Sequence, residues 1–255
     1  MDDNALKYKI TRSWLSYAWI PTGIGKLLDA GCAKGESSLL FLKKSKEVFG
    51  IDINEKRIEK ARQNCPAGHF ICGSIENTSF GNDFFDAVVM NEVLEHVNNE
   101  VRSLNEIFRI LRKGGIFVVS VPHNGFFAFL DPANFKFFLK KYWPSILHIF
   151  YRKQIGEHGF SYIFQEGVHR HYTLNKFLTL VNSSRWGNHY RIERVFKSGL
   201  VLGALGNSLR ALLRKVVGER WAMKLLFPLF FLASREYWIP FGPLSYNIAI
   251  SLKKL

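Results

Sequence analysis

Short, continuous apolar runs alternate with helical segments through the first 124 residues, and this alternation limits the folds that the chain can adopt. The helix expected over 55–64, for example, begins after a good N-cap residue, Asn54. Apolar runs without polar alternation are typical of strands covered on both faces, as in a parallel sheet. The sequence therefore predicts an α/β fold with an open, mostly parallel twisted sheet and helices on both faces. The expected strands are 26–29, 48–52, 69–72, 85–90 and 116–121.

The second half of the chain has a different composition. Residues 1–124 carry 16 Lys and Arg against 15 Asp and Glu, whereas residues 125–255 carry 19 against 6. Of the 38 aromatic residues, 12 lie in the first half and 26 in the second. Such a partition indicates different tasks for the two halves. We predict a ligand-binding core over 1–124, an aromatic and basic helical insertion or cap over 125–160, and a C-terminal part over 161–255 that completes the sheet and contains an amphipathic helical region over 198–245.

Cysteine usage and hydropathy bear on the compartment. The three cysteines show neither metal-ligand spacing nor an even disulfide framework, which favours a reducing compartment. The N-terminal stretch MDDNALKYK is acidic and lacks the apolar run of a secretory signal. No segment reaches the roughly 18 to 20 apolar residues that a membrane-spanning helix needs. We expect a cytoplasmic protein, and peripheral attachment to the inner face of a membrane stays open.

A glycine-containing turn follows the first expected strand, in the stretch LLDAGCAKGESS at 27–38. A phosphate-binding loop requires Lys and then Ser or Thr after its last glycine, but Gly35 is followed by Glu36. A dinucleotide fingerprint would have its third glycine at position 36, where Glu36 would place negative charge beside the pyrophosphate. The turn therefore disfavours phosphate ligands.

A ligand with a positive centre and a nucleoside, but no phosphate, fits this pattern better. S-Adenosylmethionine has a sulfonium, an ammonium and a single carboxylate. Gly31 and Gly35 would let the backbone approach its methionine end, and Asp29 would attract its ammonium. Asp52 ends the next strand, where it is placed to accept hydrogen bonds from both ribose hydroxyls.

Four motifs between Lys26 and His123 carry a family resemblance: KLLDAGCAKGESS, VFGIDIN, GSIENTSFGNDFFDAVVMNEVLEHV and LRKGGIFVVSVPH. In this order and spacing they resemble the class I S-adenosylmethionine-dependent methyltransferases, in the broad group that includes the quinone-biosynthesis C-methyltransferases. The segment HRHYT at 169–173 resembles one that follows the fifth strand in this group. The resemblance implies a Rossmann-like fold and S-adenosylmethionine as the methyl donor.

The resemblance also implies roles for individual residues at the cofactor. Asp52 would bind the ribose, Ile53 would pack on the adenine, and Asn91 would border the transferred methyl. Ala33 stands where glycine is common, and Ser74 stands where the family commonly has an acid. The positions that match the family's cofactor contacts are Gly31, Ala33, Gly35, Asp52, Ile53, Ser74, Ile75 and Asn91.

Three histidines are candidates for proton transfer. Methyl transfer is a direct displacement, so a base is needed only for a poor nucleophile such as an aliphatic hydroxyl. His96 follows the fourth expected strand, His123 follows the fifth, and His171 lies in the HRHYT segment. Packing or capping roles for these histidines stay open. His169 and His171 would share a face of an extended segment, but no third ligand is evident, so no metal is predicted.

The acceptor is suggested by the basic, aromatic half of the chain. The stretch FFAFLDPANFKFFLKKYWPSILHIFYRK mixes apolar and basic groups, as membrane-surface segments do. We expect the parts over 125–160 and 198–245 to cap the cofactor cleft and face an anionic membrane, so that the acceptor is a lipid, a lipid-linked glycan or another amphipathic molecule. A soluble small-molecule acceptor stays open, as does a non-catalytic binding module. RNA is disfavoured, because Asn91-Glu92-Val93-Leu94 replaces the Asn-Pro-Pro-Tyr type motif of nucleic-acid amine methylation.

Overall fold

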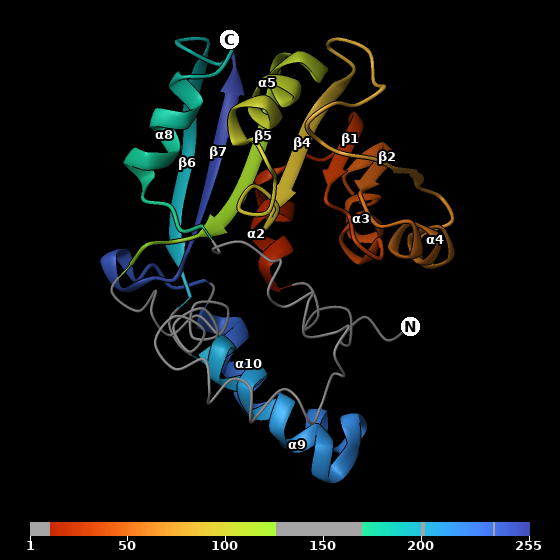
Figure 1. Ribbon diagram of the computed structural model, residues 1–255, viewed down its shortest axis with the longest axis vertical. Coiled ribbons are helices and arrows are strands. Elements are labelled where there is room, and N and C mark those ends of the chain that lie inside the picture. Colours follow the sequence, from red (N-terminus) through yellow and green to blue (C-terminus); the bar gives the residue numbers. More distant parts are fainter. Residues whose placement is uncertain (1–10, 126–169, 200–201, 237) are drawn as a thin grey trace.

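The computed structural model describes residues 11–125, 170–199, 202–236 and 238–255. These residues form a sheet, helices packed against it, and two further helices that lie beyond the ends of its strands (Figure 1). The strands are β1 (Ile24–Ala30), β2 (Ser45–Asp52), β3 (His69–Cys72), β4 (Phe85–Asn91), β5 (Leu111–Pro122), β6 (Tyr190–Ser198) and β7 (Asn247–Lys254). The α-helices are α2 (Thr11–Trp19), α3 (Glu36–Phe41), α4 (Glu55–Asn64), α5 (Glu100–Ile110), α8 (Leu174–Asn182), α9 (Leu202–Leu225) and α10 (Phe227–Glu236).

The seven strands form one sheet in the order β3-β2-β1-β4-β5-β7-β6. The first five in this order run parallel to one another, whereas β7 is antiparallel to both β5 and β6. This is the open, mostly parallel sheet that the alternation of strands and helices predicted, and the predicted fold class is confirmed. All carboxyl ends of the parallel strands lie at one edge, on the side where α9 and α10 are found (Figure 1).

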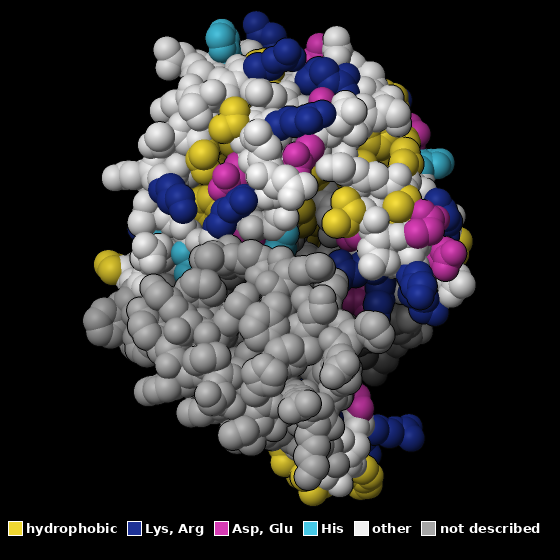
Figure 2. All heavy atoms as spheres, in the orientation of Figure 1, with side chains coloured by type: hydrophobic (Ala, Val, Ile, Leu, Met, Phe, Trp, Pro, Cys, Tyr) yellow, Lys and Arg dark blue, Asp and Glu magenta, His cyan; other side chains and the backbone are white. Residues whose placement is uncertain are grey.

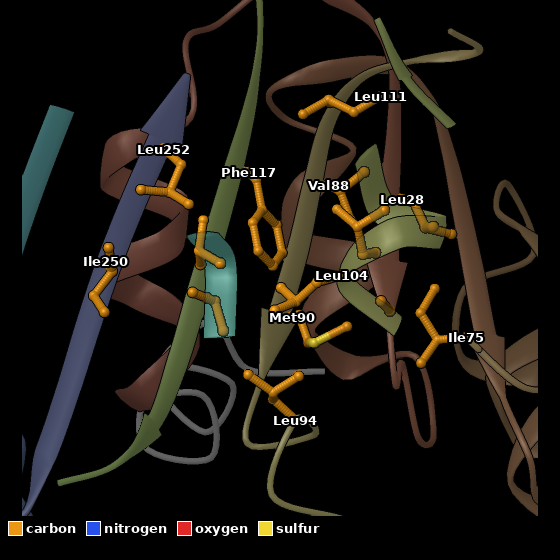
Figure 3. Packing of buried hydrophobic residues seen from close by; sticks show 14 of the residues in the cluster. Leu28, Ile75, Val88, Met90, Leu94, Leu104, Leu111, Phe117, Ile250 and Leu252 are labelled. Atoms are coloured by element: carbon orange, nitrogen blue, oxygen red, sulfur yellow. The ribbon is translucent and has the colours of Figure 1, made fainter. Parts of the chain in front are cut away.

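Apolar side chains cover both faces of the sheet, as the continuous apolar strands require. On one face, Leu28 and Val88 pack in a cluster with residues of α5 and α8. Figure 3 shows part of this cluster. On the other face, Leu27 and Val89 pack with residues of α2 and α3. Each such side chain contributes about 1.5 to 3 kcal/mol when fully buried, so the two clusters hold the helices against the sheet.

The apolar side chains of Val101, Leu104, Ile107, Phe108 and Leu111 recur at helical spacing and predict a helix over 100–112, but the helix is shorter in the structure. Helix α5 ends at Ile110, and Leu111 already belongs to β5, where it pairs with Phe85 of β4. Pairing with the sheet thus overrides the helical pattern over the last two residues. Helix α2 has no counterpart among the elements predicted from the sequence.

The division of the second half stays a prediction. The insertion expected over 125–160 falls almost entirely outside the described residues. The region 198–245 contains α9, which has a non-helical residue at Gly218 (φ 78°), and α10, which packs against α9. A 3-10 turn, η2 (Gly242–Leu244), leads into β7. None of the described helices is long and apolar enough to cross a membrane.

Candidate functional site

Three loops meet at the carboxyl edge of the sheet. Strand β1 lies between β2 and β4, with Ala30 paired to Ile51 on one side and to Met90 on the other. The residues that follow these pairs are Gly31, Asp52 and Asn91. Ligands of open α/β sheets bind at this edge, where neighbouring strands lead in opposite directions. The structure thus brings together the main residues of the predicted cofactor site.

The turn after β1 has an unusual backbone. Gly31, Ala33 and Gly35 all have positive φ, at 79°, 46° and 75°. A Cβ at Gly35 would lie 3.1 Å from the backbone of Ala61 in α4, and one at Gly31 would overlap the side chain of Val93. Glycine is therefore required at both ends of the turn by close contacts as well as by φ. Ala33 adopts a conformation that glycine tolerates better, which explains why the family commonly has glycine there.

Asp52 and Ile53 place a carboxylate next to an exposed apolar side chain. The Asp52 carboxylate is buried, and its two oxygens accept hydrogen bonds from the backbone N–H groups of Ala33, at 3.1 Å, and Asn54, at 2.9 Å. The Ile53 side chain is 77% exposed, although isoleucine is normally buried. A carboxylate that can accept further hydrogen bonds beside an apolar surface suits a ribose and an adjoining base.

Ser74 and Ile75 lie past the end of β3. Ser74 is exposed, and its hydroxyl accepts a hydrogen bond from the N–H of Glu76 at 3.2 Å. The Ile75 side chain is only 5% exposed and belongs to the core. The Glu76 carboxylate accepts from the N–H of Asn98, at 2.8 Å, which directs it to the loop before α5. Contacts of Ser74 and Ile75 with a base remain predictions.

Asp29 adds a second carboxylate. It lies in β1, is 3% exposed, and accepts a hydrogen bond of 2.6 Å from the Ser38 hydroxyl. Burial raises the pKa of Asp29 to about 6, the hydrogen bond from Ser38 opposes this, and the charge of Asp52 raises it further. Asp29 is therefore mostly charged at pH 7, and a ligand cation nearby would stabilise the charged form.

Asn91 ends β4 and is held by two hydroxyls. Ser16 of α2 donates to Asn91 Oδ1 at 2.7 Å, and Ser120 of β5 donates to the same oxygen at 3.1 Å. Asn91 Nδ2 is buried and has no hydrogen-bond partner within the described part of the chain. The next residue, Glu92, has φ 53°, and its carboxylate accepts from Asn247 Nδ2 at 2.7 Å. A buried polar atom without a partner is costly, and a ligand can supply one.

Comparison with known families agrees with this arrangement. Residues 28–119 match the family model described as methyltransferase domain, and the match runs from within β1 to within β5 and includes all the loops described above. Residues 28–119 thus match a methyltransferase domain and are similar to S-adenosylmethionine-dependent methyltransferases. The resemblance predicted from the four motifs is thereby confirmed.

Related proteins match part of the chain. A "Probable S-adenosylmethionine-dependent methyltransferase" of Mycolicibacterium smegmatis is 31% identical over 97 residues, which is 38% of each chain. The demethylmenaquinone methyltransferase of Symbiobacterium thermophilum is 29% identical over 130 residues, 48% of this chain and 50% of the relative. A solved geranyl diphosphate methyltransferase in complex with S-adenosylmethionine has a TM-score of 0.56 at 16% identity, covering 97% of this chain and 85% of its own. The chain thus matches half or less of the length of these two curated relatives, and the solved structure shows the fold alone.

The predicted histidines lie on segments that contact one another beside the candidate site. His123 forms a β-bridge with Tyr172, the residue after His171. His96 is exposed on the loop after β4, and Arg170 donates to the carbonyl of Val97 on the same loop, at 2.8 Å. The loop carrying His96 and the segment carrying His171 are therefore joined by this contact. Any role in proton transfer stays a prediction.

His123 has the surroundings of a neutral imidazole. It is 4% exposed, and its Nδ1 lies 3.0 Å from the carbonyl oxygen of Ser245. Because a carbonyl can only accept, Nδ1 carries the hydrogen and Nε2 keeps its lone pair. Burial lowers the pKa of His123, the hydrogen bond with Ser245 opposes this, and the charge of Lys197 lowers it further.

The other two histidines have contacts of their own. The Nε2 atom of His96 lies 3.8 Å from Oε1 of Glu95. The backbone carbonyl of His171 accepts a hydrogen bond from Lys176 Nζ at 3.1 Å.

Over residues 11–125, 170–199, 202–236 and 238–255, no group of three His, Cys, Asp or Glu side chains could hold a metal ion. His169 lies outside these ranges. Sequence reasoning did not predict Glu92 as a site residue. It also missed three residues that contact Asn91 or Glu92: Ser16, Ser120 and Asn247. Glu92 directly follows a strand that ends at the site, and this position could have indicated it. The two serines and Asn247 are brought in by tertiary contacts, and no local pattern marks them.

Proposed function

We propose that the protein transfers a methyl group from S-adenosylmethionine to an amphipathic acceptor held between the sheet edge and the helices α9 and α10. The observation that carries the cofactor half of this proposal is the pair Asp52 and Ile53. A buried carboxylate tied to the glycine turn and an exposed isoleucine beside it match the polar and apolar parts of an adenosine. Each Asp52 oxygen accepts one backbone hydrogen bond and can accept another, and the isoleucine offers its apolar surface to a base.

The charges at the site suit this cofactor. Asp29 and Asp52 are buried carboxylates close enough for the charge of one to raise the pKa of the other. A ligand with two positive groups and one carboxylate relieves this repulsion, whereas a dinucleotide would increase it. Asp29 would attract the ammonium, Asp52 would bind the ribose and Ile53 would pack on the adenine. Gly31, Ala33 and Gly35 would line the methionine end, and Asn91 would border the methyl.

S-Adenosylmethionine supplies a methyl group that its sulfonium activates for direct displacement. The protein then has mainly to orient the acceptor in line with the methyl, and to take up a proton where the acceptor is a hydroxyl. We propose His123 for that step, because its pKa is lowered and its Nε2 has a lone pair. His96 and His171 are the alternative proton acceptors. Ser245, in the segment that joins η2 to β7, contacts His123, so a cap over 198–245 would adjoin the proposed proton acceptor.

The acceptor half of the proposal rests on the surface of α9 and α10. Large apolar side chains are exposed here: Trp221 is 61% exposed and Leu225 is 59% exposed. Figure 2 shows hydrophobic side chains gathered at the tip of the molecule where Figure 1 has these helices. We call this set the apolar tip: Val216, Val217, Trp221, Leu225, Phe227, Phe231 and Leu232.

Basic groups flank the apolar tip. Residues 202–236 contain six Lys and Arg and two Glu. Lys224 Nζ lies 4.8 Å from the Trp221 ring centroid, and the Arg235 guanidinium lies 5.1 Å from that of Phe231. One of the two acids, Glu219, is paired with Arg210. Exposed apolar groups with cations beside them fit an anionic bilayer surface, where each nearby cation contributes about 1 kcal/mol to the binding free energy. Exposed patches of this kind mark interaction sites.

Two measurements test the proposal separately. Isothermal titration with S-adenosylhomocysteine tests the cofactor half in protein shown to be folded by circular dichroism, and absence of binding would reject it. For the acceptor half, the protein and S-adenosylmethionine carrying a deuterated methyl are incubated with lipid and glycan extracts. Mass spectrometry should find the label in a lipid or lipid-linked fraction. Label confined to water-soluble molecules would instead establish a soluble acceptor.

Binding to vesicles provides the second arm of the acceptor test. Co-sedimentation should rise with the fraction of phosphatidylglycerol in phosphatidylcholine vesicles and fall with salt, since exposed charges are screened within about 10 Å at 0.1 M. RNA would show the same dependence on salt, so an RNA oligonucleotide is added as a competitor. Tight RNA association with background binding to all vesicles would contradict the membrane proposal.

A further inference from the structure

Helix α2 contacts its neighbours through two buried serines, one of which reaches the candidate site. Ser13 and Ser16 are three residues apart and therefore lie on one face of the helix. The Ser13 hydroxyl bonds that of Ser37 in α3 at 2.6 Å, and the Ser16 hydroxyl bonds Asn91 at 2.7 Å. Both serines are buried, with 7% and 1% of their surface exposed. One hydroxyl thus joins α2 to a neighbouring helix, and the other joins it to the end of β4.

The Ser16 contact fixes the Asn91 amide from one side. Ser120, which pairs with Asn91 across β4 and β5, approaches the same oxygen at 3.1 Å. Because hydroxyls both donate and accept, these two serines hold the amide group in either of its orientations. The opposite atom of the amide, Nδ2 as assigned, is buried and lacks a hydrogen-bond partner among the described residues. That atom is the part of Asn91 left to contact a ligand.

The backbone after Asn91 is constrained as well. Glu92 has φ 53°, in a region that non-glycine residues rarely adopt. Its N–H donates to the Ser120 carbonyl at 2.9 Å, and its carboxylate accepts from Asn247 of β7 at 2.7 Å. Strained backbone of this kind persists where the surroundings hold it and is concentrated at functional sites. A contact from β5 thus fixes the main chain at Glu92, a contact from β7 holds the Glu92 side chain, and α2 contacts the Asn91 side chain.

We propose that Ser16 is a positioning residue, which holds Asn91 in the orientation needed beside the methyl group of the bound cofactor. The inference rests on the proposed cofactor placement, in which Asn91 borders that methyl. Asn91 is the group that would contact the ligand, and Ser16 acts only through it. Helix α2 is then part of the methyl-transfer site, although it precedes the matched methyltransferase domain in the chain.

The methyl group itself provides the readout. S-Adenosylmethionine labelled with carbon-13 at its methyl is bound to the full-length protein, and the methyl shift is recorded by carbon–proton correlation NMR. Ser16→Ala should move this shift in the direction that Asn91→Ala moves it. The affinity for S-adenosylmethionine relative to S-adenosylhomocysteine, which lacks the methyl, should change by about three- to tenfold, as expected for one hydrogen bond. Ser13→Ala, which removes the other hydroxyl of the same helix face, should leave both quantities unchanged.

A double mutant separates positioning from general loosening of the helix. If Ser16 acts through Asn91, Ser16→Ala should have no further effect on the shift or the affinity ratio in Asn91→Ala protein. Additive effects, or equal effects of Ser16→Ala and Ser13→Ala, would overturn the inference. If Ser16→Ala does not fold, Ser120→Ala removes the second hydroxyl from the same oxygen and makes the same test. Wild-type protein that binds neither cofactor would instead refute the cofactor placement.

Discussion

The loops at the sheet edge and the helices α9 and α10 differ in how many apolar side chains they expose to solvent. At the sheet edge, one isoleucine, Ile53, is exposed beside buried carboxylates, whereas Ile75 on the neighbouring loop lies in the core. On α9 and α10, a whole set of apolar side chains is exposed among basic groups. The first arrangement suits one small ligand with both polar and apolar parts, and the second suits an extended surface. The two regions should therefore respond independently to substitution.

Asp52→Ala should have the largest effect. It removes an acceptor of two ribose hydrogen bonds, and hydrogen bonds to a charged group contribute about 1.5 to 3 kcal/mol each. The affinity for S-adenosylhomocysteine in isothermal titration should fall at least about a hundredfold. Vesicle binding should not change. Glu55→Ala, which removes an exposed carboxylate nearby in α4, is the control and should leave cofactor affinity unaltered. A cofactor affinity for Asp52→Ala equal to that of wild type would mean that the ribose is bound elsewhere.

The double substitution Trp221→Ser and Leu225→Ser should have the next largest effect, on the other region. Both side chains are already exposed, so the free energy of unfolding should change little. Binding to vesicles rich in phosphatidylglycerol should weaken about 30- to 150-fold, from the loss of about 2 to 3 kcal/mol of apolar burial. Cofactor affinity should be unchanged.

The control for this pair is Ile192→Ser, which removes an exposed apolar side chain from β6. It should leave vesicle binding as in wild type. Equal losses for both variants would show that the effect is one of general hydrophobicity, and the apolar tip would then have no special role.

Acidification should weaken cofactor binding about tenfold between pH 7 and pH 5. The pKa of Asp29 is raised to about 6, so the carboxylate that would attract the ammonium becomes protonated in this range. The effect on stability has the opposite sign. Because the pKa of Asp29 is raised in the folded protein, the free energy of unfolding rises as the pH falls below about 6. This contribution is lost as the pH rises back through about 6. Titration at several pH values measures the affinity, and Asp29→Asn should flatten the profile. Methylthioadenosine, which has no ammonium, should bind with the same affinity at both pH values; a tenfold loss for it too would remove Asp29 as the cause.

Ala33→Gly should have the smallest effect, and a favourable one. Relief of the positive φ at Ala33 outweighs the added freedom of glycine in the unfolded chain, so the free energy of unfolding should rise by about 0.5 kcal/mol. Thermal unfolding followed by circular dichroism measures this change. Ala18→Gly in the exposed part of α2 should lower it instead, by about 1 kcal/mol. A loss of stability in Ala33→Gly would show that the turn is not strained.

Local sequence signals account for much of the methyltransferase domain. The helix over 55–64 and the strand over 69–72 have the predicted ends, because Asn54 caps the helix and the strand is a short apolar run. The carboxyl ends of parallel strands share one edge, so the sequence alone is enough to place Gly31, Asp52 and Asn91 on that edge. That they are neighbours follows from the strand order, in which β1 lies between β2 and β4. The sequence does not place Ser16 with them, because the contact of Ser16 with Asn91 spans 75 positions in the chain. Helix α2, TRSWLSYAW, has neither an acidic first turn nor a basic last turn to mark its ends.

The pairing of β6 with β7 has a consequence for how such a protein can diversify. Ser198, the last residue of β6, is the register partner of Asn247, the first residue of β7, so these strands form a hairpin whose connection happens to contain α9 and α10. The entropy lost on closing a chain segment grows only slowly with its length. The sheet therefore tolerates connections of very different size at this point. If α9 and α10 hold the acceptor as proposed, exchange of that connection changes the acceptor while the loops of β1, β2 and β4 stay as they are.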